Sequence, residues 1–351
     1  MKKTAYPLVL MLMCLLATNA CHAQDVLLRG RVVDAATNQS LPGAHVFLDQ
    51  TLRGTSTDRE GFFQMHRLPA GSYKVVASML GYSMETVSLE VIPEDTLYTI
   101  DFKLAPRVVE LAEVSVEDRR PRGWKRDFIR FNRLFLGASS NGRRAEIKNR
   151  YALDFETADN VFKARASEPL EIENRSLGYR ITFILTDFRM DQNTDLLHMQ
   201  GPFYFTELEP TSQNEADRWR ANREKTYKGS LQHILRSLIS NNHVIQGYNI
   251  LIDDRENAPH SDEAVYLRSI EGLSIVEPTE RDYLYRISFS DYLYIEYENE
   301  LSWVEMNREE AKIHTSGYVY APFYEQGALT VHGALSARRV ADLLPRDYNL
   351  D

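Results

Sequence analysis

The chain has 351 residues, of which 43% are hydrophobic, and its formal net charge at pH 7 is −9. This length predicts two or three domains, at roughly 100–200 residues per domain. The apolar content excludes a wholly disordered chain. The acidic balance argues against a nucleic-acid binder, which needs lysine and arginine to neutralise phosphates.

The first 23 residues have the pattern of a secretory signal peptide. A positively charged start is followed by a short apolar core, Leu8 to Ala17, and then by small and polar residues. Cleavage after Ala23 leaves Gln24 as the first residue. In the alternative, Cys21 is a lipoprotein cysteine that carries a lipid anchor. Both predict an exported protein in the periplasm or at the outer membrane or cell surface of a Gram-negative bacterium.

The cysteines also belong to this segment. The chain has two, Cys14 and Cys21, so a chain cut after Ala23 contains none. That excludes disulfides, thiolate metal sites and cysteine nucleophiles from the mature protein. Its stability must then come from packed cores.

Residues 25–104 alternate between apolar and polar side chains with a period of two. Three such runs are Tyr73–Met79, Val87–Val91 and Tyr98–Leu104, separated by turn-forming residues. One buried and one wetter face per strand is typical of antiparallel sheets. The region therefore predicts an all-β, two-sheet sandwich of about seven short strands.

The same region carries an ordered series of motifs. They are Gly30-x-Val32-x-Asp34, Leu41-Pro42-Gly43-Ala44-x-Val46, Gly54-x-x-Thr57-Asp58-x-x-Gly61-x-Phe63, Leu68-x-x-Gly71-x-Tyr73 and Gly81-Tyr82. The series resembles the carboxypeptidase-regulatory-like domain found at the N-terminus of TonB-dependent receptors and other envelope proteins. The resemblance implies a transthyretin-like (transthyretin/Ig-like) sandwich and an envelope setting, with no catalytic residue to carry over.

Zinc carboxypeptidases use a His-x-x-Glu pair and a distant third histidine. The pair His260 and Glu263 has this spacing, with His314 or His332 downstream. The pair lies in an acidic, proline-containing stretch that predicts a solvated loop. The zinc carboxypeptidase is therefore the weaker reading, and no metal site or cofactor is predicted.

Residues 105–123 predict one further strand and a basic linker, and residues 124–351 an α+β domain of antiparallel strands with a central helical segment. An amphipathic helix is expected at Trp124–Leu136 and a longer one at 212–241, where Ser212 and Glu215 form a capping box and Gly229 marks a kink or a break. A short closing helix is expected at Ala337–Leu344. A small outer-membrane barrel is a further alternative, but the 212–241 helix has no place in one.

Two segments of this second region are distinctive, Pro169–Tyr179 and Trp219–Arg236, and both are similar to the tails that follow this sandwich in other envelope proteins. Within the second segment, Arg223, Tyr227 and Ser230 share a face if the helix is continuous. His233 is a candidate base, but its position relative to the leucine stripe predicts a surface histidine. These four residues are the candidate binding residues.

Asp191-x-Asn193-x-Asp195 has the alternating oxygen ligands of a calcium loop. Leu196 replaces the glycine such loops need, and no glutamate closes the loop, so the pattern favours a turn. No catalytic set is complete. The sequence predicts a non-catalytic envelope protein that binds a protein or a glycan and associates with the outer membrane through a partner or a lipidated Cys21. A hydrolase centred on Arg223–Arg236 is the alternative.

Overall fold

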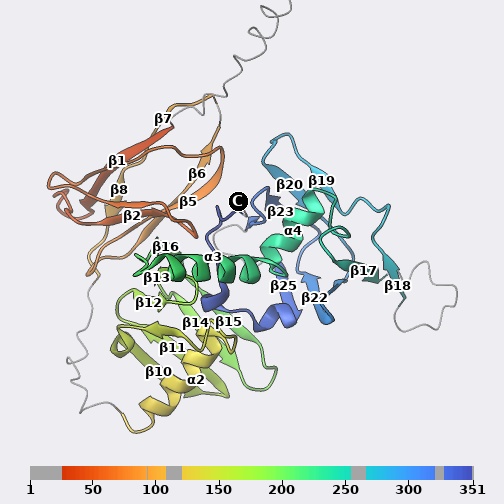
Figure 1. The fold of residues 1–351 in the computed structure, drawn as a ribbon. Helices are drawn as coiled ribbons and strands as arrows, with labels where there is room; N and C mark the ends of the chain where they lie inside the picture. The colour runs from red at the N-terminus through yellow and green to blue at the C-terminus, as the bar shows by residue number, and fades with distance from the viewer. Residues whose placement is uncertain (1–25, 93, 108–120, 254–265, 321–327, 350–351) are drawn as a thin grey trace, which may run out of the picture.

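A computed structural model describes residues 26–92, 94–107, 121–253, 266–320 and 328–349. The predicted signal peptide, the strand and most of the linker expected at 105–123, and the His260–Glu263 pair lie outside these residues. The described chain forms three lobes, each with its own hydrophobic core (Figure 1). The sandwich is followed by a second lobe that begins at α2 and a third lobe that begins at α4. The region treated above as one α+β domain thus contains two cores.

The sandwich consists of two sheets of short strands. Its strands are β1 (Leu27–Asp34), β2 (His45–Leu48), β3 (Gly54–Ser56), β4 (Phe62–Met65), β5 (Gly71–Ser78), β6 (Glu85–Val91), β7 (Leu97–Thr99) and β8 (Phe102–Leu104). One sheet has the order β3-β2-β5-β6, and in the other β1 pairs with β4, β7 and β8. The predicted sandwich is confirmed, but β1 runs parallel to β7 and β8 where the alternation predicted antiparallel neighbours.

The motif turn of the sandwich explains two of its signature residues, Asp58 and Gly61. One carboxylate oxygen of Asp58 accepts hydrogen bonds from the backbone N–H of Glu60 at 3.0 Å and of Phe62 at 2.8 Å. Gly61 has a φ of +82°, and a Cβ there would lie 2.7 Å from the carbonyl oxygen of Val32. Only glycine fits this turn.

The second lobe packs helix α2 (Trp124–Leu136) against two four-stranded sheets. Their strands are β9 (Ala145–Ile147), β10 (Leu153–Ala158), β11 (Val161–Ala166), β12 (Leu170–Asn174), β13 (Tyr179–Phe183), β14 (Asp187–Asp191), β15 (Leu197–Gln200) and β16 (Phe203–Glu207), with a 3-10 turn η2 at Arg150–Ala152. Helix α2 has the predicted bounds, and its Phe131, Phe135 and Leu136 are fully buried. Phe135 lies edge-on to Phe183 with ring centroids 5.2 Å apart. The amphipathic spacing of α2 is therefore a core-packing pattern.

The long helix predicted at 212–241 is two helices, α3 (Gln213–Tyr227) and α4 (Leu231–Ile239). The Ser212 side chain accepts a hydrogen bond from the N–H of Glu215, as the capping box predicted. Gly229 has a φ of +71° and separates the helices, and Ser230 caps α4. Because the helix is interrupted, its side-chain phase is not continuous from Arg223 to His233.

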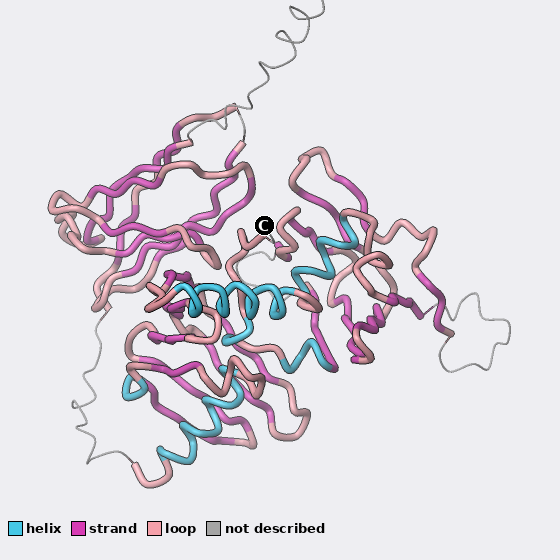
Figure 2. The backbone as a smooth tube through the Cα atoms, viewed as in Figure 1, coloured by secondary structure: helices cyan, strands magenta, loops and turns pink. Residues whose placement is uncertain are grey.

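The third lobe packs α4 on two sheets, ordered β18-β17-β21-β22-β25 and β19-β20-β23-β24. The strands are β17 (Asn249–Asp253), β18 (Leu267–Ser269), β19 (Val276–Pro278), β20 (Leu284–Ile287), β21 (Tyr292–Tyr297), β22 (Glu300–Met306), β23 (Ala311–His314), β24 (Val319–Tyr320) and β25 (Leu329–Gly333). Apolar residues Ile234, Leu235 and Leu238 of α4 are buried in this core. Figure 2 shows that helix is the minor component throughout the described chain.

The closing helix predicted at Ala337–Leu344 is absent: two 3-10 turns, η4 (Ala334–Ala337) and η5 (Val340–Asp342), flank extended backbone. This C-terminal segment spans all three lobes. Leu335 is buried in the third core, Val340 is buried in the second, and the N–H of Arg346 donates to the carbonyl oxygen of Gln50 in the sandwich. Extended chain covers more than twice the distance per residue that a helix does, so the span favours it.

The sandwich is joined to the second lobe by backbone hydrogen bonds. The Gln50 N–H donates to the Phe203 carbonyl at 2.7 Å, and the Phe205 N–H donates to the Thr51 carbonyl at 2.9 Å. Contact with the third lobe runs through Glu90, which accepts from the Tyr283 hydroxyl and pairs with Arg281 at 3.1 Å. Within the described ranges, no helix is both long enough and apolar enough to span a bilayer.

Candidate functional site

The candidate residue Arg223 connects the two distinctive sequence segments. Its Nε donates to the Leu177 carbonyl at 2.7 Å, and its guanidinium lies 3.9 Å from the ring centroid of Tyr179. One turn earlier in α3, the Trp219 indole N–H donates to the Arg175 carbonyl at 2.7 Å. Helix α3 thus docks on the β12–β13 turn. The distinctive residues of both segments form this contact between the helix and the turn.

Tyr227 and His233 come together at the break between α3 and α4. Their ring centroids are 4.8 Å apart, and both side chains are buried, so the surface position predicted for His233 is wrong. The His233 ring contacts the Tyr248 hydroxyl (2.7 Å, at Nδ1) and Gln246 (3.2 Å, at Nε2). Burial lowers the pKa of His233.

Ser230 is the N-cap of α4: its Oγ accepts a hydrogen bond from the backbone N–H of His233. The Arg223 guanidinium contacts the β12–β13 turn and Glu207 instead. The four candidate residues therefore do not converge on one cavity, which weighs against the hydrolase.

The calcium-like pattern forms a turn. The Asp191 Oδ1 accepts from the N–H of Asn193 at 2.8 Å and of Thr194 at 3.3 Å, and Asp195 has a positive φ of 57°. Among the described residues no group of three or more His, Cys, Asp or Glu side chains has the arrangement of a metal site. His314 and His332 lie on strands of different sheets, β23 and β25.

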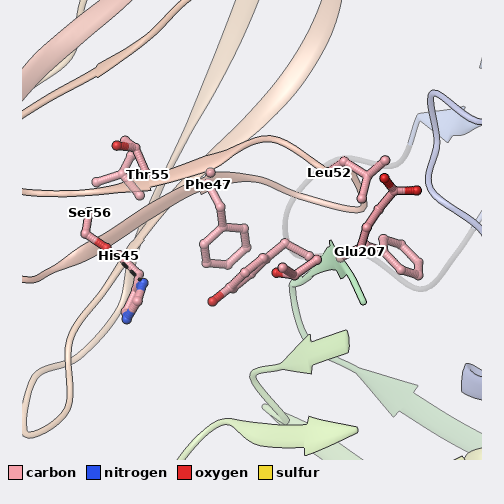
Figure 3. Close-up of a pocket in the computed structure, with 11 residues that line it drawn as sticks. His45, Phe47, Leu52, Thr55, Ser56 and Glu207 are labelled. Atoms are coloured by element: carbon pink, nitrogen blue, oxygen red, sulfur yellow. Dashed lines mark hydrogen bonds between the residues drawn. The ribbon is translucent and has the colours of Figure 1, made fainter. Parts of the chain in front are cut away.

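A groove lies between the sandwich and the second lobe. We call it the edge groove; it has a volume of about 410 Å³ and is lined by residues of β2, β3 and β16 together with Leu52. In Figure 3, His45 and Ser56 lie at one end of it and Leu52 and Glu207 at the other. The buried Phe47 ring forms its floor, 4.6 Å from the ring centroid of Tyr204.

Strand β3 gives the edge groove unused backbone hydrogen-bonding groups. The Leu48 N–H donates to Arg53 and the Thr57 N–H to Ala44, so by the antiparallel alternation Gly54 and Ser56 face away from β2. Strand β3 is the edge of its sheet, and both residues are exposed. The groove thus combines an open strand edge, an aromatic floor, and polar ends at His45 and Glu207.

Residues 28–116 match the family model of the CarboxypepD_reg-like domain. This part of the chain is a carboxypeptidase-regulatory-like domain. The match covers the whole sandwich from β1 to β8, including the β2 and β3 side of the edge groove. The match does not extend to the second and third lobes. The family that it identifies is a regulatory-like domain.

Solved structures to which the chain is similar match about a quarter of its length. The major pilin subunit BcpA of Bacillus cereus is 9% identical over 24% of this chain and 31% of its own, with a TM-score of 0.22. The 5-hydroxyisourate hydrolase of Klebsiella pneumoniae is 19% identical over 23% of this chain and 91% of its own, with a TM-score of 0.20. The chain thus spans about a third of the pilin's length. A search of curated proteins found no match.

Proposed function

We propose that the protein is an exported, non-catalytic component of the bacterial cell envelope that binds an extended segment of a partner protein in the edge groove. The open edge of β3 is the observation that carries this proposal. A peptide laid along Gly54 and Ser56 gains backbone hydrogen bonds on that edge, as in other complexes formed by strand addition.

The side chains of the edge groove fit such a peptide. Tyr204 is half-buried, so its ring supplies apolar contact area. Leu52, exposed over 39% of its surface, extends this apolar contact toward the second lobe. His45 and Glu207 are exposed at the two ends, where they can bind polar side chains.

Site-specific photocrosslinking in the native envelope tests the proposal. A photoreactive residue in place of Thr55, which lines the groove, should yield a discrete protein adduct. Ser56→Pro removes the outward N–H, so it should abolish that adduct, whereas Ser56→Thr should retain it. Ser88, exposed on β6 at the opposite edge of the sheet, is the matched control position and should give no adduct.

Equal crosslinking at Thr55 and Ser88 would contradict a specific groove. Adducts that carry only glycan would favour the other class of ligand predicted from the sequence. Export is tested separately by mass analysis of the mature N-terminus. An unmodified Gln24 start is expected for a soluble periplasmic protein, and a lipid-modified Cys21 for an anchored one.

A further inference from the structure

A second hollow lies between the sandwich, the third lobe and the C-terminal segment. This junction cavity has a volume of about 360 Å³ and is lined by the sandwich, the end of α4, the β23–β24 turn and the C-terminal segment. Its ionisable lining groups are Arg53, Arg236, His314, Arg346 and Asp347. The C-terminal segment places Arg346 and Asp347 beside residues of the sandwich and of the third lobe.

Among the described residues, no carboxylate forms an ion pair with the buried cation of Arg346. Only 7% of the residue is exposed. Its Nη1 donates to the Ser72 carbonyl at 2.6 Å and its Nε to the Ser316 hydroxyl at 3.3 Å, while its Nη2 is buried without a hydrogen-bond partner. The guanidinium lies 5.0 Å from the ring centroid of Tyr73. Buried charges are ordinarily paired, so this unused donor needs an anion.

Other unused groups in the junction cavity are donors as well. The Arg236 Nε is buried and unpartnered, while its Nη1 donates to the Tyr227 hydroxyl. The His314 Nδ1 accepts the Ser316 N–H at 2.9 Å, so the neutral ring carries its hydrogen on Nε2. That Nε2–H faces the Ala70 carbonyl but lacks a hydrogen bond of good geometry.

The charges of the lining favour an anion. Three arginines face a single carboxylate, Asp347, which Arg53 approaches at 3.8 Å. Burial holds the pKa of His314 at about 3, so this ring adds donor capacity and no charge at neutral pH. The lining therefore carries two net positive charges, which match a dianion.

We propose that the junction cavity binds an oxyanion of phosphate type, held by Arg346, Arg236 and the His314 Nε2–H. A planar arginine guanidinium can donate two parallel hydrogen bonds to phosphate oxygens. The volume of the junction cavity accommodates a phosphate with a small attached group. The phosphate is either free or carried on a sugar. An occupant in this place contacts the sandwich, the third lobe and the C-terminal segment, and so stabilises their arrangement.

Calorimetric titration of the full mature chain with inorganic phosphate and with glucose 1-phosphate tests the proposal, with chloride at matched ionic strength as the control. Phosphate binding and a raised melting temperature are expected, and none with chloride. Binding of both phosphates indicates that the free anion suffices, and binding of glucose 1-phosphate alone indicates a sugar-borne phosphate. No binding of either phosphate at about 10 mM would overturn the proposal.

Variants locate the binding. Arg236→Gln and Arg346→Gln should each weaken phosphate affinity about 10- to 100-fold, the loss expected for one charge-assisted hydrogen bond. The control is Arg281→Gln, which removes an interlobe ion pair with Glu90 outside the cavity and should leave affinity unchanged. Circular dichroism identifies a variant that fails to fold, in which case the other carries the test. An equal loss in the Arg281 variant would refute the assignment.

Discussion

Asp49 makes the contact between the sandwich and the second lobe sensitive to pH. Its Oδ1 accepts the Phe203 N–H at 3.0 Å. Burial raises the pKa of Asp49 from 3.8 to about 6, although this hydrogen bond and the Lys74 charge act in the opposite direction. At neutral pH the folded protein therefore holds an unfavourably buried carboxylate, and Asp49→Asn should relieve that cost.

The magnitude follows from the difference between the pKa values of the folded and unfolded states. A group whose pKa is raised on folding stabilises the fold at pH values below its unfolded pKa, and that contribution disappears as pH rises through the folded pKa. A shift from 3.8 to about 6 corresponds to about 3 kcal/mol, lost between about pH 4 and pH 7. Asparagine keeps the acceptor for the Phe203 N–H but does not titrate.

Urea unfolding of the wild type and of Asp49→Asn at a series of pH values measures this effect. The two proteins share their histidines, whose titration cancels in the difference. The variant should gain stability relative to the wild type by about 3 kcal/mol between about pH 4 and pH 7.5. Asp282→Asn removes an exposed carboxyl and controls for net charge. A difference for Asp49→Asn that stays constant across this range would refute the reasoning.

Three further substitutions test the packing. Gly178→Ala places a Cβ 2.3 Å from the Trp219 ring at a φ of +69°, so it should destabilise the fold by about 2–4 kcal/mol. The control is Gly272→Ala, which has a φ of +80° and open space around the new Cβ and should cost only about 1 kcal/mol. Equal losses of stability in thermal unfolding would contradict the steric argument. Phe135→Ala should cost about 3–5 kcal/mol in urea unfolding because the side chain is fully buried. Ser212→Ala should cost about 1 kcal/mol and speed hydrogen exchange in the first turn of α3, unless the Glu215 N–H finds another acceptor.

Several local features were predictable from the sequence. The period-two runs and motif turns identified the sandwich, and the spacing of phenylalanines gave α2 with its observed bounds. The capping box at Ser212 and the glycine break at position 229 were likewise readable, because caps and backbone conformation depend on a few adjacent residues. The three-residue β18 and the seven-residue β22 were not predicted, since their partners and not their own patterns determine pairing.

The environment of the candidate residues depended on tertiary contacts. His233 was expected at the surface, but the break at Gly229 reorients α4 and buries its ring beside Tyr248. Arg223 was read as a binding residue, whereas its partners are carbonyl groups of the β12–β13 turn, some 45 positions earlier in the chain.

The strands of the sandwich, the bounds of α2, the cap of α3 and the turn chemistry could be predicted because each is set by interactions between neighbours along the chain. Only the tertiary structure brought β3 next to β16 and placed Arg53, Arg236 and Arg346 around one cavity. The C-terminal segment brings Arg346 to the sandwich after passing the cores of the third and second lobes, and no local pattern in the sequence records that path.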